Sequence, residues 1–449
     1  MTPSKPLWIK SPLAILADGD ASGGIVVSGG KVVELVPAGG SPTLECTAFD
    51  ASRHVVLPGL INTHHHFYQT LTRAHPAAIN KELFDWLTAL YPIWAKLGPD
   101  GLRLATRLAL VELMLSGVTC SSDHHYVFPG GLEDALDIQA EEASALGIRM
   151  VLNRGSMNLS KKDGGLPPDS VVQDHDTILA DCERVIGKYH DAGEGAMLQV
   201  ALAPCSPFSV TRELMRDTAT LASKCGCALH THLGETHDED EFCVSMFGCR
   251  PVDYLEDCGW LGDKTWLAHG IHFGDDEIGR LGGAGVGVSH CPTSNAVLAS
   301  GFCRTRDLEA AGVKVGLGVD GSASNDSSNL MEGARHALML NRLRYDATVT
   351  HFDVLRWATA GSAACLGRSD IGTIAEGKQA DLALFTLDEL RFSGAHDPLA
   401  ALILCGAHRA DRVMIAGKWT VEDGMPVGID IGKLRHEHGA VAKLFAEAT

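Results

Sequence analysis

The sequence predicts an α/β fold in which a (β/α)8 TIM-like barrel is joined to a β-sandwich lobe built from both chain termini. Its 449 residues are more than one small core requires and suit a large α/β domain with an accessory lobe. Short apolar runs alternate with longer helical patterns through the middle of the chain, and both flanks read as short strands. Hydrophobic residues make up 45% and charged residues 21%, ordinary values for a globular protein.

The two flanks have the same pattern. Apolar segments at 24–27 and 31–36 are separated by Gly and Pro, and similar segments recur at 381–385 and 412–418. This pattern is typical of small antiparallel strands. We therefore expect residues 1–57 and 379–449 to form one composite β-sandwich domain.

The middle of the chain, 58–378, is predicted to form the catalytic barrel. Its candidate strands are 59–63, 118–122, 149–153, 198–203, 228–231, 265–268, 285–289 and 315–319. Helical patterns such as 101–116, 132–146 and 211–224 fall between them. Eight strand–helix repeats over about 300 residues favour a barrel, with catalytic groups at the strand ends. An open doubly wound sheet fits the alternation nearly as well until the polar residues are considered.

Charge and cysteine content narrow the class of protein. Lys+Arg 37 against Asp+Glu 56 give a net charge of −19, which disfavours nucleic acid and anionic membranes as partners. The 13 cysteines lack zinc-finger spacing and are predicted to be free thiols in a reducing compartment. The first ten residues do not resemble a signal peptide, and no apolar run approaches the ~20 residues that span a bilayer. A cytoplasmic enzyme is expected.

Four predicted strands end on residue types that bind metals. These residues are His64 and His66 on the first strand, His232 on the fifth, His269 on the sixth and Asp320 on the eighth. Alternate side chains of a strand face the same way, so His64 and His66 converge while His65 points elsewhere.

Three imidazoles and a carboxylate suit zinc or a similar divalent ion and leave a position for water. Each residue alone is more often structural than functional. Their joint placement at strand ends predicts a metal site of His64, His66, His232 and Asp320.

Longer motifs occur in one order along nearly the whole chain. They are Pro58-Gly-Leu-Ile-Asn-Thr-His-His-His66, His232-x-x-Glu235, His269, His290-Cys-Pro-x-Ser-Asn295, Gly318-Val-Asp-Gly321 and Gly372-Thr-Ile-x-x-Gly-Lys-x-Ala-Asp381. This series resembles the amidohydrolase superfamily, specifically its aminohydrolase and chlorohydrolase branch. The resemblance implies a barrel with a composite β-lobe. Two-metal members of the superfamily carry a modified lysine at the end of strand four. This chain has Ala-Pro-Cys-Ser-Pro at 203–207 instead, so the resemblance implies one metal per chain. Zinc is the preferred metal and iron is the alternative.

The resemblance also implies catalytic roles for three residues. Glu235 protonates a ring nitrogen and then helps protonate the departing amine, Asp320 accepts a proton from the attacking water, and His269 orients that water. The ordinary alternatives are a solvated acid for Glu235, which precedes a charged stretch, and a structural histidine for His269.

Gln69, three residues after His66, occupies the place at which guanine-deaminase-like relatives contact the substrate ring. The other candidate substrate contacts are Tyr68 and Trp86 as stacking residues, Arg73 and Arg154 as carbonyl-binding residues, and Cys205 after strand four. Ordinary packing is the alternative for the two aromatic residues.

The segments 64–74 and 203–209 are most similar to 8-oxoguanine deaminases, which implies conversion of 8-oxoguanine and water to urate and ammonia. The alternatives are deamination of isoxanthopterin or guanine, or hydrolysis of an N-alkylamino- or chloro-triazine. A barrel without catalysis would require loss of a ligand or of the acid, and all of them are present. We expect a small heteroaromatic substrate and a homo-oligomer.

Overall fold

The structure is a computed structural model that describes residues 5–447. These residues form three sheets, of which the largest has eight strands in the order β7 to β14. The strands are β7 Leu60–Asn62, β8 Val118–His125, β9 Arg149–Ser156, β10 Leu198–Pro204, β11 Ala228–Leu233, β12 Thr265–His269, β13 Gly287–His290 and β14 Lys314–Leu317. Each neighbouring pair is parallel. All eight candidate strands of the sequence are confirmed.

The first and last strands of this sheet meet and close the barrel. The backbone N–H of Thr63 donates to the carbonyl of Leu317 at 3.0 Å, and the N–H of Asp320 donates to the carbonyl of His64 at 3.0 Å. A sheet closed in this way is a barrel, so the alternative of an open doubly wound sheet is excluded.

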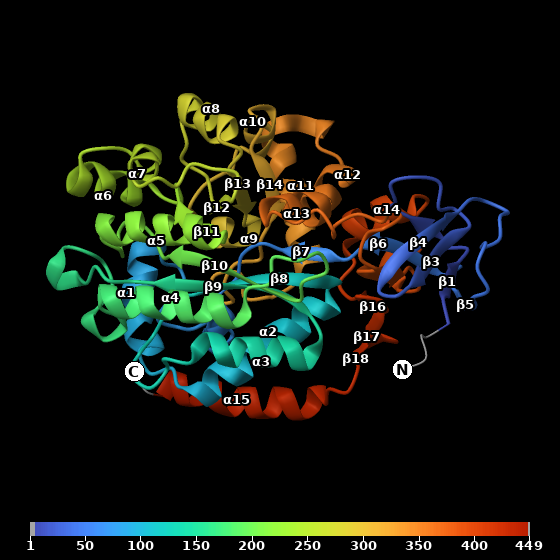
Figure 1. The fold of residues 1–449 in the computed structure, drawn as a ribbon, viewed down its shortest axis with the longest axis horizontal. Helices are drawn as coiled ribbons and strands as arrows, with labels where there is room; N and C mark the ends of the chain where they lie inside the picture. The colour runs from blue at the N-terminus through green and yellow to red at the C-terminus, as the bar shows by residue number, and fades with distance from the viewer. Residues whose placement is uncertain (1–4, 448–449) are drawn as a thin grey trace.

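The helices lie mostly outside the barrel strands (Figure 1). Their bounds are α1 Leu83–Trp94, α2 Pro99–Leu115, α3 Ala135–Leu146, α4 His175–Tyr189, α5 Arg212–Cys225, α6 His237–Phe247, α7 Pro251–Asp257, α8 Asp275–Gly283, α9 Pro292–Val297, α10 Thr305–Ala310, α11 Leu330–Tyr345, α12 His351–Arg356, α13 Ser362–Cys365, α14 Pro398–Ala401 and α15 Ile431–Glu447. Helix α5 shows how local sequence sets such bounds: the Thr211 side chain accepts the N–H of Leu214 at its start, and left-handed Gly226 follows its end.

The chain ends build a separate lobe at one side of the barrel (Figure 1). Its strands are β1 Leu7–Lys10, β2 Ala14–Ile15, β3 Gly24–Ser28, β4 Lys31–Val36, β5 Thr47–Asp50, β6 His54–Pro58, β15 Leu382–Thr386, β16 Arg412–Ile415, β17 Lys418–Glu422 and β18 Met425–Pro426. One sheet has the order β4-β3-β1-β5 and the other β18-β17-β16-β15-β6-β2. Because N-terminal β6 pairs antiparallel with C-terminal β15, the lobe is composite, as the sequence predicts.

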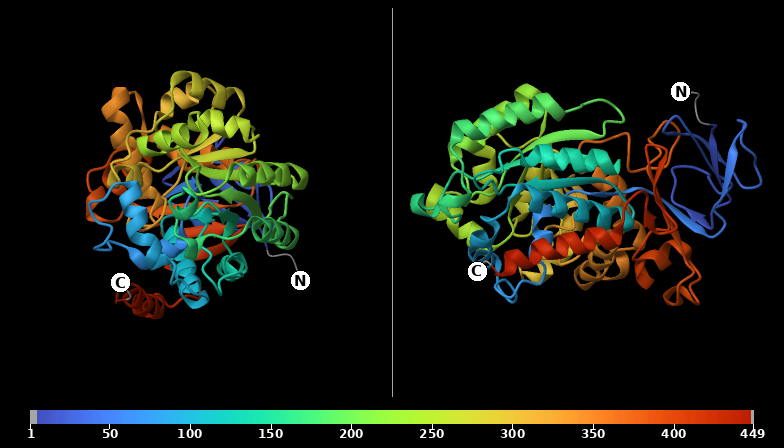
Figure 2. Two further views of the ribbon diagram at one scale, coloured as in Figure 1. Left: turned by 90° about the vertical axis from the view of Figure 1, so that its left-hand side faces the viewer. Right: turned by 90° about the horizontal axis from the view of Figure 1, so that it is seen from below.

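The lobe and the barrel are tied together by buried charges and by the last helix. The Arg149 guanidinium on β9 binds the Asp381 carboxylate at 2.7 and 3.1 Å, with both side chains buried. Helix α15 leaves the lobe and packs against α2 and the short helix Phe67–Thr72, running along the barrel in Figure 2. The range 379–449 thus contributes to both parts, and the domain boundary at 379 stays a prediction.

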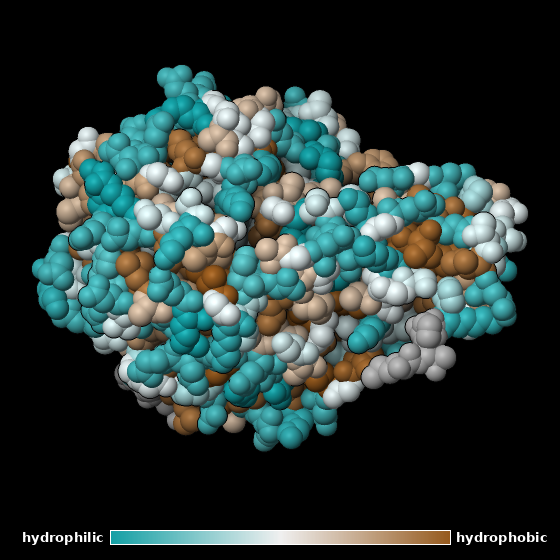
Figure 3. All heavy atoms as spheres, in the orientation of Figure 1, coloured by the Kyte–Doolittle hydropathy of each residue, from teal (hydrophilic) through white to brown (hydrophobic). Residues whose placement is uncertain are grey.

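The surface is mostly polar on the face shown in Figure 3, with apolar side chains scattered between charged ones. Between residues 5 and 447, no helix has the length and hydropathy needed to cross a bilayer.

Candidate active site

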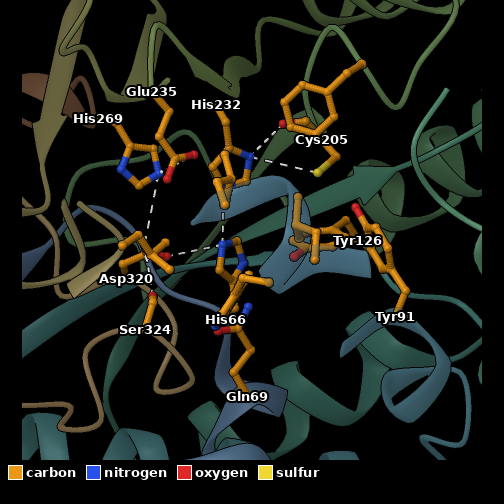
Figure 4. Close-up of a pocket in the computed structure, with 15 residues that line it drawn as sticks. His66, Gln69, Tyr91, Tyr126, Cys205, His232, Glu235, His269, Asp320 and Ser324 are labelled. Atoms are coloured by element: carbon orange, nitrogen blue, oxygen red, sulfur yellow. Dashed lines mark hydrogen bonds and ion pairs between the residues drawn. The ribbon is translucent and has the colours of Figure 1, made fainter. Parts of the chain in front are cut away.

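A pocket lies where the barrel strands end (Figure 4). Its lining consists of His66, Gln69, Leu83, Trp86, Leu87, Tyr91, Tyr126, Cys205, Phe208, His232, Glu235, His269, Leu298, Asp320 and Ser324. These residues come from β11 and β12, from helix α1 and from segments that follow other strands. The lining combines apolar side chains with a few titratable groups, which is the usual composition of a small-molecule site.

The structure brings the four predicted metal ligands together. Oδ1 of Asp320 lies 3.3 Å from Nε2 of His64 and 3.3 Å from Nε2 of His66. Nε2 of His66 lies 3.2 Å from Nε2 of His232. Tetrahedral zinc with Zn–N bonds of about 2.0–2.1 Å separates its ligand atoms by about 3.3 Å. The spacing of these atoms therefore fits a single ion.

The tautomer of His64 also fits a metal ligand. Nδ1 of His230 lies 2.9 Å from the Trp266 carbonyl, which can only accept, so His230 carries its proton there. Its Nε2 then accepts from Nδ1 of His64 at 2.8 Å. Burial keeps the pKa of both imidazoles well below 6.5, so both are neutral. Nε2 of His64 is left with a lone pair and has no hydrogen-bond partner within the described chain.

His66 and His232 are oriented in the same way. Nδ1 of His66 donates to the His124 carbonyl at 2.7 Å, and Nδ1 of His232 donates to the Cys205 carbonyl at 2.6 Å. Both Nε2 atoms consequently present lone pairs to one another, an arrangement that a cation between them stabilises. His65 points away and lies 2.9 Å from the Ser328 hydroxyl.

Glu235 and His269 stand beside this ligand group. Nε2 of His269 lies 3.4 Å from Oε2 of Glu235 and 3.9 Å from Oδ2 of Asp320, while its Nδ1 donates to Oδ1 of Asn295 at 2.8 Å. Burial raises the pKa of Glu235 to about 7. Burial lowers the pKa of His269, but the carboxylates of Glu235 and Asp320 outweigh it and raise the pKa above its ordinary value. These groups can exchange protons near neutral pH.

Two of these residues have backbones in the left-handed region. The φ angle is 72° at His269 and 67° at Asp320. Non-glycine residues rarely adopt this conformation, which concentrates at functional sites. In this barrel it occurs at the last residue of β12 and three residues after the end of β14, and both side chains line the pocket.

Gln69 and Trp86 both form hydrogen bonds with the backbone of Ala323, in the segment that follows Asp320. Oε1 of Gln69 accepts the N–H of Ala323 at 3.3 Å, and Nε1 of Trp86 donates to the Ala323 carbonyl at 3.1 Å. A Cβ at Gly321 would lie 1.9 Å from Oε1 of Gln69, so glycine permits this approach. Nε2 of Gln69 is left as a buried donor without a partner in the described structure. It is available to a ligand.

Comparison with known proteins agrees with this geometry. The Amidohydrolase family matches residues 55–420, which is most of the chain. The chain belongs to the amidohydrolase family. As a member of that family it is a hydrolase, and its buried His/Asp group is a metal site by composition and spacing.

Several known proteins are similar to this chain over most of their length. The 8-oxoguanine deaminase of Pseudomonas aeruginosa is 62% identical, over 97% of this chain and 98% of that protein. An isoxanthopterin deaminase from an unknown prokaryotic organism is 35% identical over 88% and 87%. Among solved structures, the atrazine chlorohydrolase of Arthrobacter aurescens TC1 complexed with zinc has a TM-score of 0.91 at 32% identity, over 97% and 100%.

Three substrate candidates lie outside the lining of the amidohydrolase pocket. Tyr68 is 1% exposed and packs in the core. The Arg73 guanidinium is paired with Glu112, and Nε of Arg154 lies 2.6 Å from Asp181. Their acidic partners are 39 and 27 residues away in sequence, so no local motif indicated these ion pairs.

The prediction missed other parts of the pocket wall. They are Leu83, Leu87 and Tyr91 on α1, together with Tyr126, Phe208, Leu298 and Ser324. The α1 side chains recur at helical spacing, which indicates only an apolar face. His230 is the buried hydrogen-bond partner of His64. It lies two residues before His232 and repeats the H-x-H spacing of the first strand, and this spacing is the feature from which the sequence could have indicated it.

Proposed function

We propose that the chain is a metal-dependent aminohydrolase that converts 8-oxoguanine and water to urate and ammonia. The observation that carries this proposal is the placement of the buried carboxyl of Glu235 beside the His/Asp ligand group, 3.4 Å from His269. Such a carboxyl serves leaving groups that need protonation, as an amine does. The 62% identity to a deaminase of this substrate supports the choice of ring.

The proposed cofactor is one zinc ion per chain, held by His64, His66, His232 and Asp320; iron is the alternative for the same donors. The related chlorohydrolase structure that contains zinc supports the preference. When bound, such an ion lowers the pKa of a coordinated water from about 15.7 to about 7, so that a nucleophile exists at neutral pH.

The two oxygens of Asp320 allow it two tasks. Oδ1 faces His64 and His66, whereas Oδ2 lies 3.5 Å from the Ser324 hydroxyl and 3.9 Å from His269. Oδ2 accepts only this long hydrogen bond from Ser324, and its other lone pair is proposed to take a proton from the attacking water. Glu235, with a pKa of about 7, gives a proton to the ring nitrogen next to the amino-bearing carbon.

The reaction balances with these transfers. The water oxygen bonds to the ring carbon after Asp320 takes its first proton, and its second proton passes to the Glu235 carboxylate as it becomes the carbonyl oxygen of the product. The C–N bond breaks when the amino group takes up one proton from these two carboxyl groups and leaves as ammonia, and the proton that remains restores the starting state. His269 is the third proposed catalytic residue. Because Asn295 fixes its ring, it orients the attacking oxygen.

Recognition of the ring is assigned to groups that face the pocket. Nε2 of Gln69 and the Tyr91 hydroxyl are buried donors with no partner among residues 5–447, and donors of this kind fit the carbonyl oxygens of an oxopurine. Trp86 and Cys205 also line the pocket and are proposed to contact the ring. Arg73 and Arg154 are not assigned to ring recognition, because their guanidinium groups are already paired with carboxylates.

A panel of substrates tests the proposal. Metal-replete protein is incubated with 8-oxoguanine, guanine, isoxanthopterin, an N-alkylamino-triazine and a chloro-triazine, and ammonia, alkylamine and chloride are measured. We expect equimolar urate and ammonia from 8-oxoguanine, with kcat/KM at least about tenfold above the other compounds. Faster release of alkylamine or chloride would favour the triazine alternative, and absence of ammonia from every purine and pterin would refute deamination.

We further propose that the enzyme is a homo-oligomer of the cytoplasm. Its free cysteines suit a reducing compartment. The exposed Leu343 and Leu404 offer apolar surface for self-association. Light scattering during size-exclusion chromatography measures the oligomeric state, and a mass of one chain would refute the oligomer.

A further inference from the structure

Helix α6, which follows the turn that carries Glu235, begins in an unusual way. Thr236-x-x-Glu239 has the sequence of a capping box, in which the threonine side chain accepts the N–H of the third helical residue and the glutamate accepts the threonine N–H. The Thr236 side chain accepts no such bond, and its hydroxyl is buried without a partner in the part of the chain that is described. The expected box is not formed.

The Glu239 carboxylate reaches further back along the chain. Its Oε1 accepts the N–H of Gly234 at 2.9 Å, and its Oε2 accepts the N–H of Glu235 at 3.1 Å. The Glu239 residue is 0% exposed. Both of its oxygens therefore accept hydrogen bonds from the backbone of the turn that carries Glu235, the proposed acid.

The opposite side of this turn is also fixed. The Gly234 carbonyl accepts the N–H of Ile271 at 2.8 Å and that of His272 at 2.9 Å. Gly234 has a φ of 66°, and a Cβ there would lie 2.5 Å from the Phe273 ring. The segment after β12 thus holds the turn from one side, while Glu239 holds both of its N–H groups from the other.

We propose that Glu239 is a positioning residue that fixes the Glu235 carboxyl relative to His269. It does not belong to the pocket lining, so it acts through the backbone of Glu235 and not on the substrate. This inference rests on the proposed role of Glu235 as the proton donor. A shift of about 1 Å in such a group reduces turnover by up to about 100-fold.

Helix α12 supplies a matched control. Its Thr350 and Asp353 form the ordinary capping box: the N–H of Thr350 donates to Oδ2 of Asp353 at 2.8 Å, and the N–H of Asp353 donates to the Thr350 hydroxyl at 3.4 Å. Figure 1 shows α12 on the opposite side of the barrel from α6. The substitution D353N therefore makes the same carboxyl-to-amide change at a helix start, where it also loses the ion pair with Arg306, without touching the catalytic turn.

The test compares E239Q and D353N in the metal-loaded enzyme. Glutamine keeps the volume of Glu239 but directs an NH2 group at a backbone N–H, so one of the two bonds is lost. We expect kcat of E239Q to fall at least about tenfold with KM within about threefold, and D353N to stay within about twofold of wild type. If E239Q does not fold, E239D keeps the carboxyl group on a shorter side chain and is expected to lose kcat in the same sense.

A double mutant separates positioning from a general structural role. When Glu235 is already replaced in E235Q, adding E239Q should reduce the remaining rate by less than about twofold. An equal loss in both backgrounds, or an E239Q enzyme as fast as D353N, would overturn the inference. Full activity of E235Q would instead refute the proposed role of Glu235 itself, and the role of Glu239 would fail with it.

Discussion

Nδ1 of His64 donates to Nε2 of His230 across 2.8 Å at the centre of the barrel. The Trp266 carbonyl fixes the proton of His230 on its Nδ1, so a backbone carbonyl determines, through two rings, which nitrogen of His64 is free. Partners of this kind set the orientation and basicity of a metal-binding histidine. The ligand group is therefore prepared by residues that do not touch the metal position.

The first prediction concerns this buried partner. Replacing His230 with glutamine removes the rigid acceptor for His64 and should weaken metal affinity about 10- to 100-fold. Competition with a chromogenic chelator measures the affinity. His125→Gln is the control, because the His125 ring is also buried but packs against Tyr68 and Phe128, and it should stay within about threefold. Equal zinc affinities for H230Q and wild type would contradict the proposed role of His230 in orienting His64.

The second prediction concerns Gln69, whose Nε2 is the proposed donor to a substrate carbonyl. Q69L replaces the amide with an apolar group, which removes the Nε2 donor and also the Oε1 atom that accepts the Ala323 N–H at 3.3 Å. Loss of one hydrogen bond of about 1–1.5 kcal/mol should raise KM about 5- to 15-fold, with a smaller effect on kcat. Steady-state urate formation measures both constants, and an unchanged KM would exclude Gln69 from recognition.

The third prediction concerns the junction between lobe and barrel. R149A leaves the Asp381 carboxylate buried without its guanidinium, which should reduce the free energy of unfolding by about 3–5 kcal/mol. Urea unfolding at pH 7 measures the change. In the exposed pair Lys5–Glu45, by contrast, K5A should change stability by less than about 1 kcal/mol. Similar small effects for both variants would show that the buried pair is not a structural tie.

The fourth prediction is a dependence of stability on pH. Although burial opposes it, the bound Arg368 guanidinium lowers the pKa of Asp370 from 3.8 to about 2. A carboxyl with a depressed pKa stabilises the fold above pH 4 and loses this contribution as pH falls towards 2. D370N should therefore be about 2 kcal/mol less stable than wild type at pH 7, and the difference should shrink below pH 4. A difference that stays constant down to pH 3 would contradict the ion pair.

The strands and the metal ligands were the most predictable features. Apolar runs of strand length are set by burial on both faces of a parallel barrel strand, so they appear directly in the sequence. The alternation of side chains then places His64 and His66 on one face, as the structure has them. The prediction added His232 and Asp320 to this pair because the carboxyl ends of all the barrel strands lie on the same rim.

The pocket wall was less predictable because it depends on contacts between distant segments. Arg73 and Arg154 looked like free cations until the fold supplied Glu112 and Asp181 as partners. Tyr91 lies on an apolar helix face that sequence alone cannot distinguish from core. Glu239 matched a capping motif but makes different bonds, because the turn before α6 is shaped by the segment after β12.

A zinc titration tests the central claim most directly. Metal-free protein is mixed with increasing zinc, and ammonia release from 8-oxoguanine is measured at each step. A single site of His64, His66, His232 and Asp320 predicts activity that rises linearly and stops rising at one equivalent of zinc per chain. A break at two equivalents, or full activity without metal, would contradict the account.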